Sequence, residues 1–288
     1  MKPFSRNSAN PALRFSLALL CFLFVLGCAQ EIPATYKEKD IPAVVKKICQ
    51  EEYNLFVETR VVGNTLWVYA PLSRILHKEY GLNQEKIFDE VMSETLRNIM
   101  TSIGRVLISA DKSPEFYALV ISDIKERGLD YTIIGNVLDI KKSYAGLLPW
   151  PEMNQRYVIK LEESPGALAD TEGRHLQYHP VTWGEFLAGQ VAQRLDARFR
   201  QKDLKNLYEI KKVAGEFIRQ KLVVNADIIK QPLLLPVASS DRIIEETLKT
   251  VNEVMRAYDF RDYTEVEINI PQTGKDVTFS RGAVEVLK

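Results

Sequence analysis

The hydrophobic pattern begins with helical spacing and then changes to alternation. Apolar positions three and four apart, between Val44 and Cys49, predict a short helix. Two runs rich in β-branched and aromatic residues follow at 55–62 and 65–72, and the Gly-Asn pair at 63–64 that joins them is a strong hairpin signal. This part of the chain therefore predicts a helix followed by a β-hairpin.

The next segments predict the best helix of the chain and three further strands. Apolar residues recur at three and four from Asn83 onward, while charged residues lie off this stripe. Strands are predicted over 116–124 and 130–140, and a fifth strand is predicted from Arg156. We expect the helix to pack on the sheet that these strands form.

Two segments without periodicity follow before the next helix. Segment 145–155 contains two prolines and is expected to be a loop, and segment 163–179 is a long loop of the kind that is usually functional or disordered. The tetrapeptide Thr-Trp-Gly-Glu at 182–185 is a capping box, in which the threonine side chain accepts from an early backbone N–H. It predicts a helix over 183–200.

The C-terminal part is charged and mixed in character. Its predicted elements are, in order, a helical segment over 201–217, a short strand over 222–229, a proline-bracketed apolar run over 231–237, a helix over 241–258, and a closing hairpin over 265–280.

These elements predict an α+β fold, with an antiparallel sheet of about five strands covered by amphipathic helices and a smaller C-terminal α+β unit. We place a weak boundary near 201–205, which gives an α+β domain over 41–200 and a smaller domain over 205–288. The order helix then hairpin occurs at 42–72 and again at 241–280. This order suggests a weak internal repeat, although residue identities between the two segments are poor.

The N-terminal segment has the pattern of an export signal. Three basic residues and no acidic residue precede an apolar run from Phe15 to Leu26, and these 12 residues are too few for a spanning helix, which needs roughly 20. The sequence Val-Leu-Gly-Cys at 25–28 resembles the lipobox of bacterial lipoproteins, where a small residue precedes a cysteine that is acylated before cleavage.

This resemblance covers only residues 1–28, and it implies where in the cell the protein is located. Residues 1–27 would be a lipoprotein signal peptide, Cys28 would carry the lipid, and the polar segment 28–40 would be a tether. More than one acyl chain makes such anchoring stable, so the mature chain would be anchored without a transmembrane helix. Because Ala29 stands where an aspartate favours retention in the inner membrane, the resemblance implies the outer membrane, facing the periplasm.

Composition limits the function classes. Removal of residues 1–27 takes away three of the 38 basic residues and none of the 38 acidic residues, so the mature chain has a net charge of −3 and no basic excess for nucleic acid. Loss of Cys21 with the signal and acylation of Cys28 leave Cys49 without an intrachain partner, and its helical spacing predicts a buried apolar role. No cofactor motif is present.

Two histidines are the first candidates for chemistry. His175 and His179 are four residues apart, a spacing that on a helix places two imidazoles on one face, as in zinc-binding pairs. Pro180 disfavours helix at His179, and in an extended chain the two would lie roughly 13 Å apart. We interpret them as two histidines in a polar loop, with a metal pair as the alternative.

Acidic residues near the predicted strands are the second candidate. Asp123, Asp130 and Asp139 lie on or beside adjacent strands, and Glu162 and Glu163 are near. Paired carboxylates at the right separation can hydrolyse a glycosidic bond. Solvated side chains on a sheet face are the simpler interpretation.

Aromatic residues are the third candidate, for binding. Trp67 and Tyr69 share one face of the first hairpin, and Trp150 lies between two prolines. Such rings suit sugar stacking or a hydrophobic partner, and core packing explains Trp67 and Tyr69 at least as well.

From these observations we expect a lipid-anchored envelope protein that faces the periplasm and binds a protein partner or envelope polymer without catalysis. The alternative is a lipid-anchored periplasmic hydrolase that uses the acidic residues or the loop of His175 and His179. A hydrolase requires at least two of these side chains in one concave pocket.

Overall fold

The computed structural model describes residues 35–77, 87–230 and 239–286, and the described fold belongs to one compact unit, residues 36–288. The predicted signal peptide and the lipobox at Cys28 lie outside the described residues. The fold begins at Tyr36, whose backbone N–H donates to the Ser109 carbonyl at 3.2 Å and whose carbonyl accepts from Asp111 at 2.9 Å. Residues 36–40 of the predicted tether are therefore packed on the fold.

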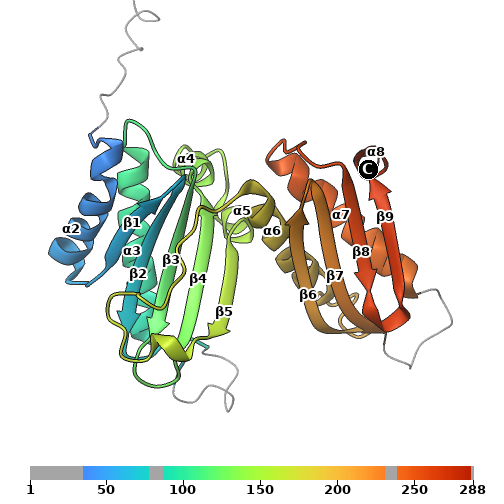
Figure 1. Cartoon of the computed structure of the whole chain (residues 1–288), viewed down its shortest axis with the longest axis horizontal. Coiled ribbons are helices and arrows are strands. Elements are labelled where there is room, and N and C mark those ends of the chain that lie inside the picture. Colours follow the sequence, from blue (N-terminus) through green and yellow to red (C-terminus); the bar gives the residue numbers. More distant parts are fainter. Residues whose placement is uncertain (1–34, 78–86, 231–238, 287–288) are drawn as a thin grey trace, which may run out of the picture. The chain divides into compact units, whose positions relative to one another are not determined.

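The first half contains a five-stranded sheet with two long helices on one side (Figure 1). Its elements are η1 (Glu38–Asp40), α2 (Ile41–Tyr53), β1 (Glu58–Val62), β2 (Thr65–Leu72), α3 (Glu90–Ile108), β3 (Phe116–Asp123), β4 (Leu129–Asn136), α4 (Val137–Tyr144), α5 (Trp150–Gln155) and β5 (Val158–Glu163).

The strand order is β1-β2-β3-β4-β5, and all neighbours are antiparallel except β2 and β3, which are parallel. The α+β class and the five strands are confirmed, but the expectation of a fully antiparallel sheet is wrong at this one pair. The reason is the long helix α3, which crosses over between β2 and β3, and a crossover of this length joins parallel strands.

Each face of this sheet is covered by different elements. Alternate residues of β2 and β3, such as Val68 and Leu119, pack against α2 and α3 in one apolar core, which also contains Cys49. The residues between them, such as Tyr69 and Val120, belong to a second core with α6 (Trp183–Phe199). Cys49 is fully buried, as the helical spacing predicts.

The second half contains a four-stranded sheet of order β6-β7-β8-β9, in which only β7 and β8 are parallel. Its elements are η2 (Pro165–Ala167), α6, β6 (Tyr208–Ile218), β7 (Lys221–Lys230), α7 (Ser239–Ala257), β8 (Glu265–Ile270), η3 (Pro271–Thr273), β9 (Lys275–Ser280) and α8 (Arg281–Glu285).

The two sheets are built by the same sequence of elements. The series α2-β1-β2-α3-β3-β4 matches α6-β6-β7-α7-β8-β9 in element order, in strand order and in the position of the parallel pair. The helix-then-hairpin order predicted at two places therefore occurs four times in the described chain. The segment α4-α5-β5 and the loop after it lie between the two series.

Helix α6 packs against both sheets. Phe186, Leu187 and Val191 are fully buried in one core that includes Trp67 of the first sheet and Val224 of the second. The predicted division near 201–205 remains a prediction, and α6 is the element that both halves share.

Two predicted elements differ from the structure in kind or length. The predicted helical segment over 201–217 is largely strand β6, because its apolar residues alternate on either side of a register shift between Ile210 and Lys212. The bulge there replaces a step of two with a step of three, which imitates helical spacing. The strand predicted over 130–140 ends at Asn136, whose side chain accepts from the Leu138 N–H at 2.9 Å and so caps α4.

Two other helix starts also differ from expectation. Helix α3 starts after Asp89, whose side chain accepts from the Val91 N–H at 3.0 Å, whereas the predicted start at Asn83 lies outside the described residues. The segment 145–155, expected to be a loop, contains α5, because Pro151 fits the first turn of a helix. The predicted apolar run 231–237 is also outside the described residues.

Candidate functional site

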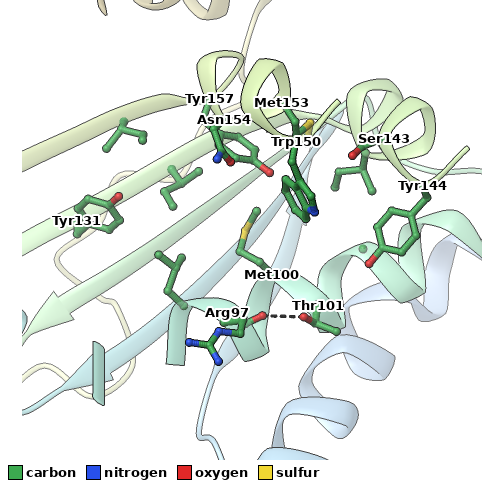
Figure 2. Close-up of a pocket in the computed structure, with 15 residues that line it drawn as sticks. Arg97, Met100, Thr101, Tyr131, Ser143, Tyr144, Trp150, Met153, Asn154 and Tyr157 are labelled. Carbon is green, nitrogen blue, oxygen red and sulfur yellow. Dashed lines mark hydrogen bonds between the residues drawn. The ribbon is translucent and has the colours of Figure 1, made fainter. Parts of the chain in front are cut away.

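An apolar pocket lies on the helix-covered side of the first sheet, between α3, strands β4 and β5, and the α4–α5 segment. It has a volume of about 350 Å³, within the range typical of small-molecule sites. Figure 2 shows Trp150 and Met100 pointing into it from opposite sides. The lining residues are Leu96, Arg97, Met100, Thr101, Gly104, Tyr131, Ile133, Ile140, Ser143, Tyr144, Trp150, Met153, Asn154, Tyr157 and Ile159. We call this site the α3–β5 pocket.

The local sequence explains why a pocket forms here. Leu96 and Met100 lie one helical turn apart on α3, and Ile133 and Ile159 are register partners on β4 and β5, so both walls present apolar side chains. The helices α2 and α3 cover the first four strands, and β5 extends the sheet beyond them. On β5, Ile159 and Leu161 therefore remain 39% and 43% exposed.

Gly104 lets the α4–α5 segment approach α3 closely. A Cβ atom at this position would lie 3.1 Å from the Tyr144 hydroxyl oxygen and 3.3 Å from its ring. The small residue therefore lets Tyr144 pack on the helix and close one end of the pocket.

The pocket is lined mainly by apolar and aromatic side chains. Among the described residues that line it, none is a histidine, cysteine, aspartate or glutamate. Burial raises the pKa of the Tyr131 hydroxyl and of the Tyr157 hydroxyl, so both remain neutral. Arg97 supplies the only charge among these lining residues. The arrangement can hold an apolar group, and Arg97 and neutral tyrosine hydroxyls are among its polar groups.

The three predicted aromatic binding residues lie in different environments. Trp150 is 66% exposed at the rim of the pocket. Trp67 and Tyr69 are only 6% and 1% exposed, and they hold the long loop on the sheet. The Trp67 indole N–H donates to the His179 carbonyl at 2.9 Å, and the Tyr69 hydroxyl donates to the Asp170 carbonyl. Neither ring offers a face to a ligand in this structure.

The structure brings together one pair of the predicted hydrolytic residues. The His175 ring lies between two carboxylates, with Nε2 3.0 Å from Asp130 Oδ2 and Nδ1 2.6 Å from Asp170 Oδ2. The Ser122 hydroxyl donates to Asp130, and the Glu172 N–H donates to Asp170 at 3.0 Å. Every member is engaged with another, and none of them lines the α3–β5 pocket. These contacts hold the loop 163–179 on the sheet.

The remaining candidates are scattered. His179 is exposed and lies beside Glu185, with 3.3 Å between its Nε2 and the Glu185 carboxylate. Asp123 accepts from the backbone N–H groups of residues 125–127, where it holds the turn after β3. Glu162 and Glu163 are exposed on β5. Over the described ranges, no group of three or more histidine, cysteine, aspartate or glutamate side chains is placed to hold a metal ion.

Asp139 has a structural role instead. Its carboxylate accepts from Arg156 at 2.8 Å and from the Tyr258 hydroxyl at 2.6 Å, and Gln190 also donates to Tyr258 at 2.8 Å. Asp139 is almost completely buried. This network joins α4, the start of β5, α6 and the end of α7.

Sequence reasoning found Trp150 but missed the rest of the pocket. Tyr144 lies between the predicted strand over 130–140 and the predicted loop over 145–155, and Met100 lies on the apolar stripe of a helix expected to pack on the sheet. An available signal was the apolar content of segment 145–155, which has no periodicity to explain it as core.

The fold and the pocket thus define an α+β protein of two mixed sheets of like topology with an apolar pocket. Comparison with protein-family models, curated proteins and solved structures found no match for this chain. Within the ranges that the structure describes, no helix is both long enough and apolar enough to cross a membrane.

Proposed function

We propose that this chain is a non-catalytic binding protein of the bacterial cell envelope. Lipid on Cys28 would hold it on the outer membrane, facing the periplasm, and the α3–β5 pocket would receive an apolar group of a protein partner or envelope polymer. The observation that carries the proposal is the pocket itself, which combines apolar walls with the exposed ring of Trp150. Apolar pockets with a few polar groups are the usual form of a binding site.

The arrangement of the titratable groups supports binding over hydrolysis. The carboxylates of Asp130 and Asp170 are engaged with His175, and Asp139 is engaged with Arg156 and Tyr258. A hydrolytic site needs such groups to face a substrate beside a pocket. Here they face one another.

Lipidation is tested on Cys28. We expect the chain expressed in a bacterial host to incorporate labelled fatty acid and to sediment with the outer membrane, and the Cys28→Ala variant to do neither. Equal labelling and fractionation of the two chains would remove the anchor from the proposal and leave the pocket untouched.

Pocket binding is tested with a neutral apolar dye, N-phenyl-1-naphthylamine. The wild type is expected to bind it at one saturable site, and Thr101→Phe, which places a ring in the pocket, is expected to weaken binding at least about tenfold, as expected when a ring displaces the buried dye. Ser93→Phe is the matched control, because Ser93 is exposed on the same helix and does not line the pocket. Equal loss in both variants, or in neither, would contradict the assignment.

A further inference from the structure

Four large apolar side chains are exposed within thirteen residues of the α4–α5 segment. Leu138, Tyr144, Leu147 and Trp150 are 56%, 60%, 76% and 66% exposed. Scattered exposed apolar residues are ordinary, but a group of them on one segment marks an interaction surface. We call these four residues, with the neighbouring Lys141 and Lys142, the α4–α5 patch.

The charged side chains of the α4–α5 patch are both cationic. Lys141 and Lys142 follow Leu138 by three and four residues, so the three lie on one face of α4. Neither lysine forms an ion pair within the described part of the chain. The acidic residues of the same segment are engaged, because Asp139 and Glu152 both bind Arg156, at 2.8 Å and 2.5 Å. The patch is therefore apolar and cationic, with both lysines partly buried.

The patch lies at the end of the first sheet where the described fold begins. Tyr36 binds the backbone of Ser109, at the C-terminal end of α3, and Tyr144 packs on Gly104 of the same helix. Five residues of helix separate these two points, which is about 7.5 Å. Figure 1 shows α4 and the start of α2 at the same end of the sheet.

The length of chain before Tyr36 limits how far the fold can lie from an anchored membrane. Eight peptide steps separate Cys28 from Tyr36, so this segment spans at most about 28 Å even when fully extended. The α4–α5 patch is a group of exposed apolar side chains at the end of the sheet where this chain enters the fold.

We propose that the α4–α5 patch docks on an anionic lipid surface, with Trp150, Tyr144 and Leu147 in the headgroup region and the two lysines against lipid phosphates. This inference adds to the proposed function and rests on it for the anchor that brings the patch to the membrane. Tryptophan and tyrosine favour the membrane interface because their rings are apolar at one end and polar at the other. Lysines close to the surface add attraction to anionic lipids.

A bilayer explains the composition of the patch better than a protein partner does. The patch has both interfacial aromatic types and unpaired lysines, whereas lysine is depleted in protein interfaces. Docking would also fix the orientation of the anchored chain. The mouth of the α3–β5 pocket, where Tyr144 and Trp150 lie, would then open beside the lipid surface.

The test uses the mature chain with Cys28→Ala, so that it does not depend on acylation. Its binding is measured by co-sedimentation with vesicles of equal parts phosphatidylglycerol and phosphatidylcholine, and with vesicles of phosphatidylcholine alone. We expect binding to the anionic vesicles, with a blue shift of tryptophan emission that Trp150→Phe removes. Leu147→Ser should weaken binding about tenfold, and Lys141→Gln about fivefold, from the attraction per lysine near the surface.

Ile218→Ser is the matched control, because Ile218 is an exposed aliphatic residue on β6. It should bind as the parent chain does. Absence of vesicle binding, or equal weakening by Ile218→Ser and Leu147→Ser, would overturn the inference, and a protein partner would then be the better occupant of the patch. Failure of Cys28 to be acylated would leave this result unchanged, so the two proposals fail separately.

Discussion

At the scale of single residues, buried charged side chains hold neighbouring elements of this protein together. The carboxylate of Asp139 is buried between Arg156 and Tyr258, and burial and this carboxylate together raise the pKa of the Tyr258 hydroxyl far above its usual value. A buried charge of this kind is tolerated only while its partners remain.

The cost of breaking this pair is the first prediction. Asp139→Ala leaves the Arg156 guanidinium without its buried partner, so we expect a loss of about 3–5 kcal/mol in the free energy of unfolding, measured by urea denaturation. Glu152→Gln is the control, because Glu152 binds the same arginine from a half-exposed position and should cost less than about 1 kcal/mol. An equal loss of unfolding free energy in the two variants would show that burial does not set the strength of these contacts.

Acid stability is the second prediction. Burial alone would raise the pKa of Asp170, but hydrogen bonds from the His175 ring and backbone lower it to about 2, below its ordinary value of 3.8. Ionised Asp170 therefore stabilises the fold above about pH 4, and this contribution is lost as the pH falls toward 2. We expect Asp170→Asn to lower the free energy of unfolding at neutral pH and to flatten its decline between pH 4 and 2. An unchanged acid profile in the variant would contradict this role.

At the scale of elements, close contact between α6 and β6 depends on a residue without a side chain. A Cβ atom on Gly215 would lie 2.2 Å from the Ala188 carbonyl oxygen, a distance at which the backbone must move. The backbones of β6 and α6 therefore approach each other directly at Gly215.

Substitution of this glycine is the third prediction. Gly215→Ala is expected to destabilise the protein by about 3 kcal/mol, the upper range for overpacking, because the obstacle is backbone rather than a flexible side chain. Gly282→Ala has open space around its Cβ and should be close to neutral. Thermal unfolding of the two variants distinguishes them, and a tolerated Gly215→Ala would mean that α6 and β6 are farther apart than described.

The elements also show where sequence reasoning succeeds and where it cannot. Hairpins β1–β2 and β8–β9 were predicted because a turn signal and alternation are local properties. Strand β6 was missed because its bulge breaks the alternation that defines a strand. The α3–β5 pocket arises where a helix, a sheet edge and a later segment meet, so only Trp150 was visible beforehand.

At the scale of the whole molecule, two related sheets share one helix. Because α6 contributes to a core with residues of both sheets, we expect the halves to lose structure together. The fourth prediction is that Asp139→Ala lowers hydrogen-exchange protection in β7 as well as in β3. Loss confined to the first sheet would instead support the two independent domains that the composition near 201–205 suggests.

The most direct test of the central claim is photo-crosslinking in living cells. A photoreactive amino acid at Ile159, in the wall of the α3–β5 pocket, is expected to give an adduct that the same probe at Ile218 does not give. Thr101→Phe should abolish that adduct, and Ser93→Phe should leave it intact. If the adduct is absent, or persists when the pocket is filled, the pocket is not the site through which this protein acts.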